Sequence, residues 1–319
     1  MSKDFYRMEI KSMLYFFINP ASRSGRGLLQ WKKTEKYLKQ NKIPYEAHIL
    51  KDSISPRPVM ETIFEKEKGT VSIVLIGGDG TINQCVNAVP NLNRLELSVI
   101  PTGSGNDFCR NKPIPTSLDE QIQNILEKKN HMYIDRGMVT YHEENTVLNR
   151  CFMVSTGIGY DAEICYMADN SKLKKILNRF KLGKLVYVLI GIKGVFDTEL
   201  TDMEVTLDGE TTHYSNVFFI ATMNQPFEGG GVAMTPNASD TDGELDFLIF
   251  HDVSRLKALM TIPLLYIKKH EGKKGVTLLR GKDVKVISSS PRILHFDGES
   301  REGTNMIHAR INGKVHLIY

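Results

Sequence analysis

Cysteine is scarce in this sequence, and long apolar runs are missing. The chain has four cysteines in 319 residues, none in a C-x-x-C pair or beside a group of histidines. This pattern disfavours the common cysteine-based zinc sites and favours the reduced thiols of a cytosolic protein. The longest uninterrupted apolar run, residues 185–192, is too short to span a bilayer. No secretory signal is evident, so we expect a cytoplasmic protein, either soluble or peripheral at the inner face of the membrane.

A strong excess of one charge is also missing. Lysine and arginine number 41 against 37 aspartates and glutamates, which gives a formal net charge of +4. So small a charge suits approach to an anionic lipid or nucleotide, but it does not predict nucleic-acid binding. Hydrophobic residues make up 41% of the chain and charged residues 24%, as in soluble globular proteins. The length allows one large domain or two ordinary ones.

Two common nucleotide-binding signatures do not occur. The sequence contains no G-x-x-x-x-G-K-[ST], which excludes a Walker-type P-loop. It contains no G-x-G-x-x-G after a strand either, because Gly103 and Gly105 are followed by Phe108 where the third glycine would stand. A dehydrogenase with the usual dinucleotide fingerprint is therefore disfavoured.

What the sequence does have is three polar strand-to-loop junctions within about its first hundred residues. Short apolar runs at 14–18, 71–76 and 97–100 lead into Asn-Pro-Ala-Ser-Arg-Ser-Gly-Arg-Gly, Gly-Gly-Asp-Gly-Thr-Ile-Asn and Pro-Thr-Gly-Ser-Gly-Asn-Asp-Phe, respectively. Open α/β sheets bind ligands in the crevice beyond the carboxyl ends of their strands. Glycine lets backbone N–H groups approach a phosphate because it has no Cβ. The three junctions therefore predict a phosphate-binding crevice.

Two aspartates in these loops are candidate functional residues. Asp79 lies among groups that would bind phosphate, which indicates that its carboxylate binds a metal ion or takes part in proton transfer. Asp107 is a second candidate ligand of Mg²⁺, because hard cations prefer oxygen. The alternative for Asp107 is a helix N-cap for the turn that begins at Phe108.

The apolar pattern divides the chain into two parts. Residues 14–135 alternate predicted strands with helical stretches, which is typical of a parallel sheet covered by helices on both faces. After Asp135-Arg136-Gly137, short alternating runs separated by Asp-Gly and Asn-Gly turns predict a mainly antiparallel β domain. We therefore expect a doubly wound α/β domain over residues 1–136 and a β-rich domain over residues 137–319.

The expected elements can be listed by residue number. They are strands at 14–18, 45–50, 71–76 and 97–100, helices near 26–40, 57–67 and 81–89, and later strands at 147–155, 203–207, 215–222, 245–250, 284–288, 292–296 and 306–311.

One basic segment interrupts the second part. Residues 171–184 carry six basic residues and no acid, with Leu173, Ile176, Leu177 and Phe180 at helical spacing. Such a helix can lie on an anionic membrane surface. The alternative is a surface helix that packs its apolar stripe on the protein core.

The set of motifs resembles the diacylglycerol kinase catalytic family, and within it the bacterial soluble lipid kinases of the diacylglycerol kinase, YegS-like and BmrU-like type. The motifs that carry the resemblance are FFINP at 16–20, GGDGT at 77–81, PTGSGNDF at 101–108, Asp242-Gly243 and Asp297-Gly298-Glu299. Their order and spacing hold from about residue 14 to residue 319. The resemblance implies an NAD kinase/diacylglycerol kinase-like α/β domain followed by an antiparallel β-sandwich.

The same resemblance implies an ATP-dependent lipid kinase. Such an enzyme transfers the γ-phosphoryl group of Mg-ATP to a lipid hydroxyl, and diacylglycerol, which would give phosphatidic acid, is the expected acceptor. A sphingoid base, phosphatidylglycerol or a prenol stays open as the acceptor. The alternatives for the whole chain are an NAD kinase and a non-catalytic nucleotide- or lipid-binding regulator on the same fold. The expected partner is lipid at a membrane surface, with no nucleic acid, and a homodimer is a candidate assembly.

Carried onto this chain, the family pattern names a set of nucleotide-binding residues. They are Asn19, Pro20, Ser22, Arg23, Gly77, Gly78, Asp79, Gly80, Thr81, Asn83, Gly103, Ser104, Asn106 and Asp107. Two departures occur: the threonine that usually ends the second strand is missing from residues 48–51, and Ser104 stands where threonine is usual.

The resemblance also places catalytic and metal-binding residues in the second part. Asp297 is the implied base that takes the acceptor hydroxyl's proton, with Glu299 as its partner or alternative, and Asp79 completes the catalytic set. On sequence alone, Asp297-Gly298 is a hairpin turn. Asp242, with the carbonyls of Ser239 and Glu244, matches the family's structural Mg²⁺ loop, although a solvated acidic turn explains these residues equally well without the resemblance.

Overall fold

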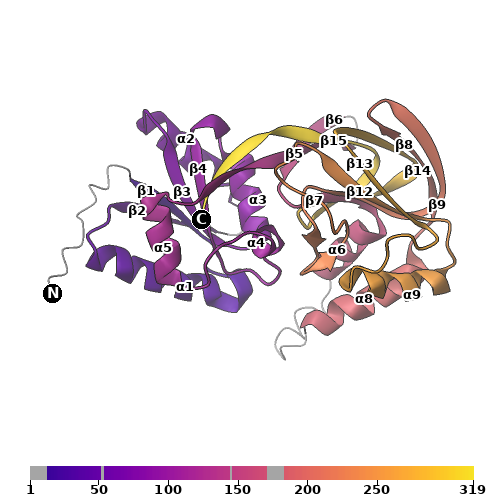
Figure 1. The fold of residues 1–319 in the computed structure, drawn as a ribbon, viewed down its shortest axis with the longest axis horizontal. Helices are drawn as coiled ribbons and strands as arrows, with labels where there is room; N and C mark the ends of the chain where they lie inside the picture. Colours follow the sequence, from indigo (N-terminus) through magenta and orange to yellow (C-terminus); the bar gives the residue numbers. More distant parts are fainter. Residues whose placement is uncertain (1–12, 52–53, 144–145, 171–182) are drawn as a thin grey trace. The chain divides into compact units, whose positions relative to one another are not determined.

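The computed structural model describes residues 13–51, 54–143, 146–170 and 183–319, and the chain forms two compact units (Figure 1). The first unit contains the described residues up to 134 together with 315–319, and the second contains those from 135 to 314. Strands β5 (His131–Glu143) and β15 (Glu299–Ile318) each run from one unit into the other. Compared with the predicted boundary after residue 136, the main difference is that residues 315–319 return to the first unit.

The first unit is built on a parallel sheet with the strand order β2–β1–β3–β4–β15. Its first four strands are β1 (Leu14–Ile18), β2 (Tyr45–Ile49), β3 (Val71–Gly77) and β4 (Leu95–Pro101). Every residue of β1 and β3 is buried, which accounts for their continuous apolar sequences. The parallel α/β class predicted for this part of the chain is confirmed.

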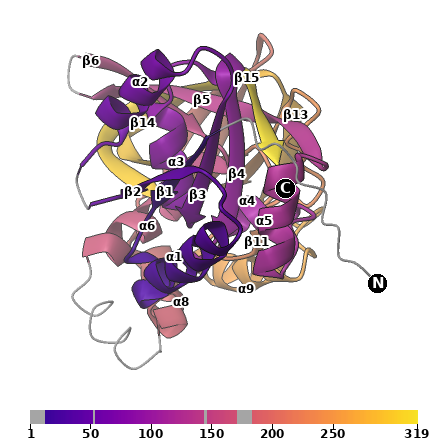
Figure 2. The ribbon, with the colours of Figure 1, turned by 90° about the vertical axis from the view of Figure 1, so that its left-hand side faces the viewer.

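Helices cover this sheet (Figure 2). They are α1 (Ser22–Gln40), α2 (Arg57–Lys66), α3 (Asp79–Ala88), the 3₁₀ helix η1 (Leu92–Arg94), α4 (Asp107–Arg110) and α5 (Leu118–Glu127). Phe16 and Ile18 lie in one apolar core with Trp31 of α1 and Ile122 of α5. Helix α2 packs beside α3.

The second unit is rich in antiparallel strands, in the order β13–β12–β9–β7–β14–β15. Strands β6 and β8 and the short pair β10 and β11 also belong to this unit. The strands are β6 (Thr146–Phe152), β7 (Ser155–Gly159), β8 (Thr201–Leu207), β9 (Glu210–Met223), β10 (Phe227–Glu228), β11 (Val232–Ala233), β12 (Leu245–His251), β13 (Val276–Gly281) and β14 (Asp283–Phe296). Strands β9 and β14 each pair with β8 along one half and with β7 along the other. Val205, Val217, Val286 and Leu294 lie in the apolar core of these strands. The β-rich class predicted for this part is confirmed.

Three helices in the second unit were not predicted. They are α6 (Tyr160–Asn170), α8 (Gly183–Asp197) and α9 (Arg255–Tyr266). Helix α9 has apolar residues on several faces and Pro263 inside it, so its sequence has no clean one-sided stripe. Ala258 and Leu265 of α9 pack with Phe219 and Phe250 in a second apolar core.

Most of the basic segment predicted at 171–184 lies outside the described residues, and only its last two positions fall within α8. Among the described helices, none combines the length and the apolar character needed to cross a membrane.

Candidate active site

The three glycine-containing loops meet because their strands are neighbours in the first sheet. Ile18 pairs with Ile76, and Ile76 pairs with Ile100, so these three residues, at or one residue before the ends of β1, β3 and β4, lie in one row. The loops leave the sheet just beyond that row. Backbone hydrogen bonds connect the starts of these loops to the end of β3. The Asn19 N–H donates to the Ile76 carbonyl at 2.9 Å, and the Thr102 N–H donates to the Gly77 carbonyl at 2.8 Å.

Side chains tie the first loop to the other two. The Asn19 amide donates to the Thr81 hydroxyl at 3.1 Å, and the hydroxyls of Ser22 and Thr102 lie 2.7 Å apart. The predicted residues Asn19, Ser22 and Thr81 therefore lie together. Thr102 was not among the predicted site residues, although it stands inside the quoted Pro-Thr-Gly motif.

Two glycines allow the second and third loops to approach each other. A Cβ on Gly78 would lie 2.8 Å from the Gly103 Cα, and a Cβ on Gly103 would lie 2.6 Å from the Gly78 Cα. A Cβ closer than 3.0 Å to a backbone atom would require the backbone itself to shift. Gly78 and Gly103 are therefore needed for the loops to pack, whereas a Cβ on Gly80 would meet nothing within 4 Å.

The backbone of the first loop is in an unusual conformation. Arg23 and Ser24 have φ values of 43° and 56°, in the left-handed region that non-glycine residues rarely adopt. Such strained backbone is concentrated at ligand-binding loops. Pro20 precedes this turn, and the regular part of α1 begins only after Gly25, which agrees with the helix predicted near 26–40.

Asp79 links the second loop to the third. Its carboxylate accepts hydrogen bonds from the backbone N–H groups of Asp107 at 3.1 Å and Phe108 at 3.0 Å, at the start of α4. Burial raises the pKa of Asp79, and the nearby Asp107 charge adds to that rise, while the two backbone hydrogen bonds oppose it. The carboxylate is thus held in place in a site that favours a neighbouring positive charge.

Asp107 and Asn106 supply further oxygen atoms beside Asp79. The Asp107 side chain is buried and accepts a hydrogen bond from Arg110 Nε at 3.0 Å. Asn106 has a left-handed backbone, and its Oδ1 is buried without a hydrogen-bond partner among the described residues. These oxygens fit the donor set that Mg²⁺ prefers, and Asn106 Oδ1 could also accept a hydrogen bond from a ligand.

The remaining predicted nucleotide residues lie in or next to the same loops. Asn83 is buried in α3 and accepts a hydrogen bond from the Asn87 amide at 3.2 Å. Ser104 is exposed between β4 and α4. Gly77 ends β3, where a Cβ would clash with the Thr81 side chain at 2.4 Å.

Asp297 occupies a different environment, in the second unit. Asp297 and Gly298 both have positive φ, at 48° and 88°, and form the two-residue turn between β14 and β15. The Asp297 carboxylate accepts backbone hydrogen bonds from Met153 and Val154 at 2.8 Å and from Ser155 at 3.0 Å. Its position is therefore fixed by the strand that begins at Ser155.

Glu299 is less constrained than Asp297. Its side chain is 39% exposed and lies 3.6 Å from Arg301 Nη2. The sequence could not separate the two acids, but the structure distinguishes a fixed carboxylate from a more exposed one.

The loop around Asp242 forms a hydrogen-bonded acidic turn. Asp242 accepts a hydrogen bond from the Glu244 N–H at 3.1 Å, and its other oxygen lies 3.6 Å from Arg280 Nη1. The Ser239 and Thr241 hydroxyls are 3.0 Å apart. The solvated-turn alternative explains these contacts, and the structural Mg²⁺ site at Ser239, Asp242 and Glu244 stays a prediction.

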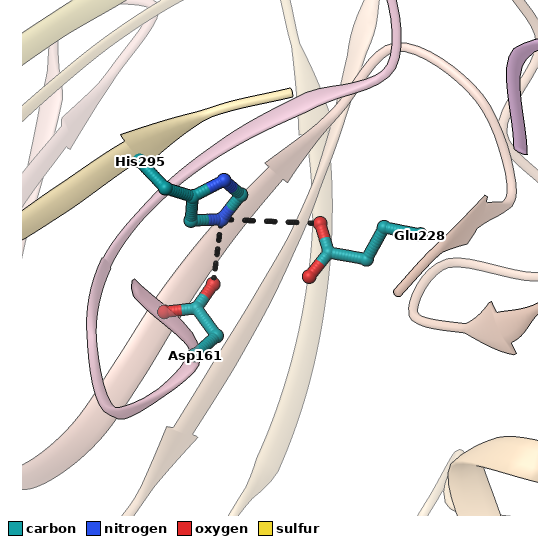
Figure 3. Close-up of side chains that lie close together, drawn as sticks. All are labelled: Asp161, Glu228 and His295. Carbon is teal, nitrogen blue, oxygen red and sulfur yellow. Dashed lines mark hydrogen bonds and ion pairs between the residues drawn. The ribbon is translucent and has the colours of Figure 1, made fainter. Parts of the chain in front are cut away.

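A second group of polar residues was missed by the sequence analysis. Asp161 at the start of α6, Glu228 in β10 and His295 in β14 are all buried and converge on one point (Figure 3). His295 Nε2 lies 3.1 Å from Asp161 Oδ2 and 4.0 Å from Glu228 Oε2. Burial alone would lower the pKa of His295, but the hydrogen bond to Asp161 and the charges of Asp161, Glu228 and Asp297 raise it to about 9. No local motif joins residues so far apart in sequence.

The loops and the two units define a class of protein: a two-unit α/β and β protein with a glycine-lined site at the carboxyl edge of a parallel sheet. Comparison with known families is consistent with this description. A family model described as diacylglycerol kinase catalytic domain matches residues 13–139. A second, described as YegS C-terminal NAD kinase beta sandwich-like domain, matches residues 153–317, which is more than half of the chain. The chain belongs to the diacylglycerol kinase-like family of lipid kinases.

Individual relatives agree with that assignment. The chain is 27% identical over 295 residues to a Bacillus subtilis protein named "Putative lipid kinase YtlR", with 89% of this chain and 92% of the relative covered. It is 29% identical over 228 residues to a Bacillus subtilis diacylglycerol kinase, with 71% and 70% covered. The fold is similar to the crystal structure of "a putative diacylglycerol kinase from Bacillus anthracis str. Sterne", with a TM-score of 0.76 and 20% identity, over 100% of this chain and 98% of that one.

The contact between Gly78 and Gly103 can be tested by adding a single methyl group. We expect Gly103→Ala to lower the free energy of unfolding by about 1–3 kcal/mol, because the added Cβ overpacks backbone that cannot move away. The affinity for Mg-ATP should fall as well, since the loops are pushed apart. Urea unfolding followed by circular dichroism and calorimetric titration measure the two effects. Gly80→Ala is the matched control and should keep its stability, and equal unfolding curves for the two variants would contradict this account.

The different environments of Asp297 and Glu299 lead to a second test. On the proposal that Asp297 is the general base, we expect Asp297→Asn to slow phosphoryl transfer at least about 100-fold, because a positioned general base contributes about 10²–10⁴-fold. We expect Glu299→Gln to slow it less than about tenfold, because that side chain is not fixed. Initial rates on folded protein, checked by circular dichroism, decide between them. The reverse order of effects would make Glu299 the proton acceptor.

Proposed function

We propose that the protein is an ATP-dependent lipid kinase that transfers the γ-phosphoryl group of Mg-ATP to a lipid hydroxyl, with diacylglycerol as the acceptor. The observation that carries the proposal is the joining of three glycine-containing loops at the carboxyl edge of β1, β3 and β4, with the Asp79 carboxylate fixed between them. Membership in the lipid kinase family supports the reaction class. The name of the Bacillus subtilis diacylglycerol kinase supports the acceptor.

In this proposal the loops of the first unit bind the nucleotide. The close approach of Gly78 and Gly103 exposes backbone to the phosphates, and Asn19 and Ser22 orient the nucleotide from the first loop. Mg²⁺, when bound, neutralises charge that develops on the phosphates. Asp79 and Asp107 are the proposed oxygen ligands for it, directly or through water.

The second unit supplies the acceptor side of the reaction. Asp297 is the proposed base for the acceptor hydroxyl, because three backbone N–H groups hold its carboxylate in one orientation. Glu299, two residues further, is the alternative.

A lipid acceptor requires contact with a membrane, and helix α9 offers a surface for it. Leu256 and Met260, one turn apart, are 68% and 61% exposed, and Ile267, which continues the same stripe, is 58% exposed. Exposed Lys268 and Lys269 follow the helix. Exposed apolar side chains beside basic residues suit insertion into the interface of an anionic membrane. The membrane contact predicted for residues 171–184 stays a separate proposal.

The decisive experiment is transfer of labelled γ-phosphate from Mg-ATP to lipids in mixed micelles. We expect labelled phosphatidic acid from diacylglycerol, and at least about a 100-fold lower rate for Asp79→Asn, because a charge that acts in the transition state is removed while the amide oxygen can still cap α4. Asp208→Asn is the matched control, since Asp208 also accepts from two successive backbone N–H groups, those of Lys282 and Asp283. Its rate should stay near that of the wild type.

The other results of this assay would change the proposal in defined ways. Labelling of a sphingoid base, phosphatidylglycerol or a prenol would keep the reaction and replace the acceptor. Labelling of NAD, added in a parallel reaction, would make the protein an NAD kinase. Nucleotide binding without transfer to any acceptor would make it a regulator.

The membrane surface on α9 is tested separately. We expect Leu256→Glu with Met260→Glu to reduce binding to vesicles of phosphatidylcholine and phosphatidylglycerol at least about tenfold in a sedimentation assay, because two charges replace apolar side chains in the interface. Transfer to a short-chain, monomeric diacylglycerol should be retained. Leu29→Glu, on the exposed face of α1 at 63% exposure, is the control. Unchanged vesicle binding by the α9 variant would exclude this surface.

A further inference from the structure

The buried group of Asp161, Glu228 and His295 lies in the second unit, and none of its members has a catalytic or nucleotide-binding role in the reaction proposed above. Its members come from three separate segments of the second unit: the start of α6, the short strand β10 and the end of β14. Each offers one ligand atom, and the three atoms lie within 4.8 Å of one another (Figure 3). We propose that these three side chains bind a first-row divalent cation such as Zn²⁺, at a site distinct from that of the nucleotide's Mg²⁺.

The distances suit such an ion. In a tetrahedral zinc site with bonds of about 2.0–2.1 Å, neighbouring ligand atoms are about 3.3 Å apart. His295 Nε2 lies 3.1 Å from Asp161 Oδ2 and 4.0 Å from Glu228 Oε2. Small side-chain rotations would therefore bring all three atoms onto one ion.

The sheet beneath the group is built to leave space for it. His295 pairs across the strands with Gly157, and Gly157 pairs with Ala221, so the next two positions across the sheet on that side of the imidazole carry a small side chain or none. A Cβ on Gly157 would lie 2.2 Å from Asp161 Oδ2 and 2.8 Å from His295 Nε2. The absence of a side chain at Gly157 is what allows the carboxylate and the imidazole to meet.

The donor set selects the kind of ion. One imidazole and two carboxylates are the ligands of zinc, manganese and iron sites, whereas Mg²⁺ prefers oxygen alone. Three protein ligands leave at least one position for water. The ion would tie β10 and α6 to the strand that ends one residue before Asp297, so its proposed role is to position that turn.

The experiment uses the full-length protein, freed of metal with a chelator and then titrated with Co²⁺ as a spectroscopic substitute for Zn²⁺, with no nucleotide present. We expect one equivalent of Co²⁺ to bind per protein chain. The visible absorption spectrum should then show the bands of a four- or five-coordinate Co²⁺ ion. Glu228→Gln and His295→Asn should each weaken binding at least about tenfold, because even loss of an outer-sphere partner costs 10–100-fold. Elemental analysis after Zn²⁺ loading gives the stoichiometry.

A matched control comes from a two-membered pair at the sheet edge. His308 Nε2 lies 2.8 Å from both carboxylate oxygens of Asp283. Among the described residues, no third histidine, cysteine or carboxylate joins this pair to form a candidate metal site. The Asp283→Asn variant should still bind one equivalent of Co²⁺ with the affinity of the wild type. Equal binding by Glu228→Gln and the wild type, or no bound equivalent in the wild type, would overturn the proposal and leave the three residues as a buried ion-pair group.

Variants of a buried group can fail to fold, so the wild type alone provides a second measurement. X-ray absorption of the Zn²⁺-loaded protein should show one imidazole, oxygen ligands and no sulfur. A sulfur ligand or several imidazoles would place the ion elsewhere. Because nucleotide is absent throughout, failure of this site leaves the kinase assay unaffected, and failure of the kinase assay leaves this test intact.

Discussion

The parallel pairing of β1, β3 and β4 is the constraint on which the proposed nucleotide site depends. Ile18, Ile76 and Ile100 form one row across the sheet, so the loops that follow leave the sheet within one residue of that row. A slip of one strand by a single residue would turn its side chains to the opposite face and shift its loop away from the others. The buried apolar residues of these strands therefore specify the site as firmly as the polar residues that line it.

Asp79 and Asp297, two of the proposed catalytic acids, are held in the same way. Asp79 accepts two backbone N–H groups at the start of α4, and Asp297 accepts three at the start of β7. Backbone donors are fixed by the fold, so a carboxylate bound to them keeps one position without relying on a flexible cation. In the proposed reaction such fixed carboxylates would carry defined charges at small entropic cost, which is the condition for electrostatic preorganisation. It also means that these acids contribute to the fold and to the proposed chemistry at once.

The sequence predicted the parts of the structure that are encoded locally. Buried strands such as 71–76 and the loops that follow them appear as continuous apolar runs ending in glycine, and neighbouring strands bring those loops together. Contacts between distant residues could not be predicted. The Asp297 carboxylate binds backbone at 153–155, and His295 meets Asp161 and Glu228, through strand pairings that no local pattern reveals. Helix α9 was missed because its apolar residues form no single stripe.

The return of residues 315–319 to the first unit makes the second unit an insertion within the first. His316 and Leu317 pair with Glu96 and Leu97 of β4, and the Tyr319 N–H donates to the Asn130 carbonyl at 3.0 Å. The sheet that carries the glycine loops is thus completed by a segment that follows the second unit in the chain. During synthesis, β4 has no β15 partner until more than two hundred further residues have been added to the chain. The sheet of the first unit can therefore be completed only after the second unit has been synthesised, and a fragment ending before residue 315 would leave β4 without its β15 partner.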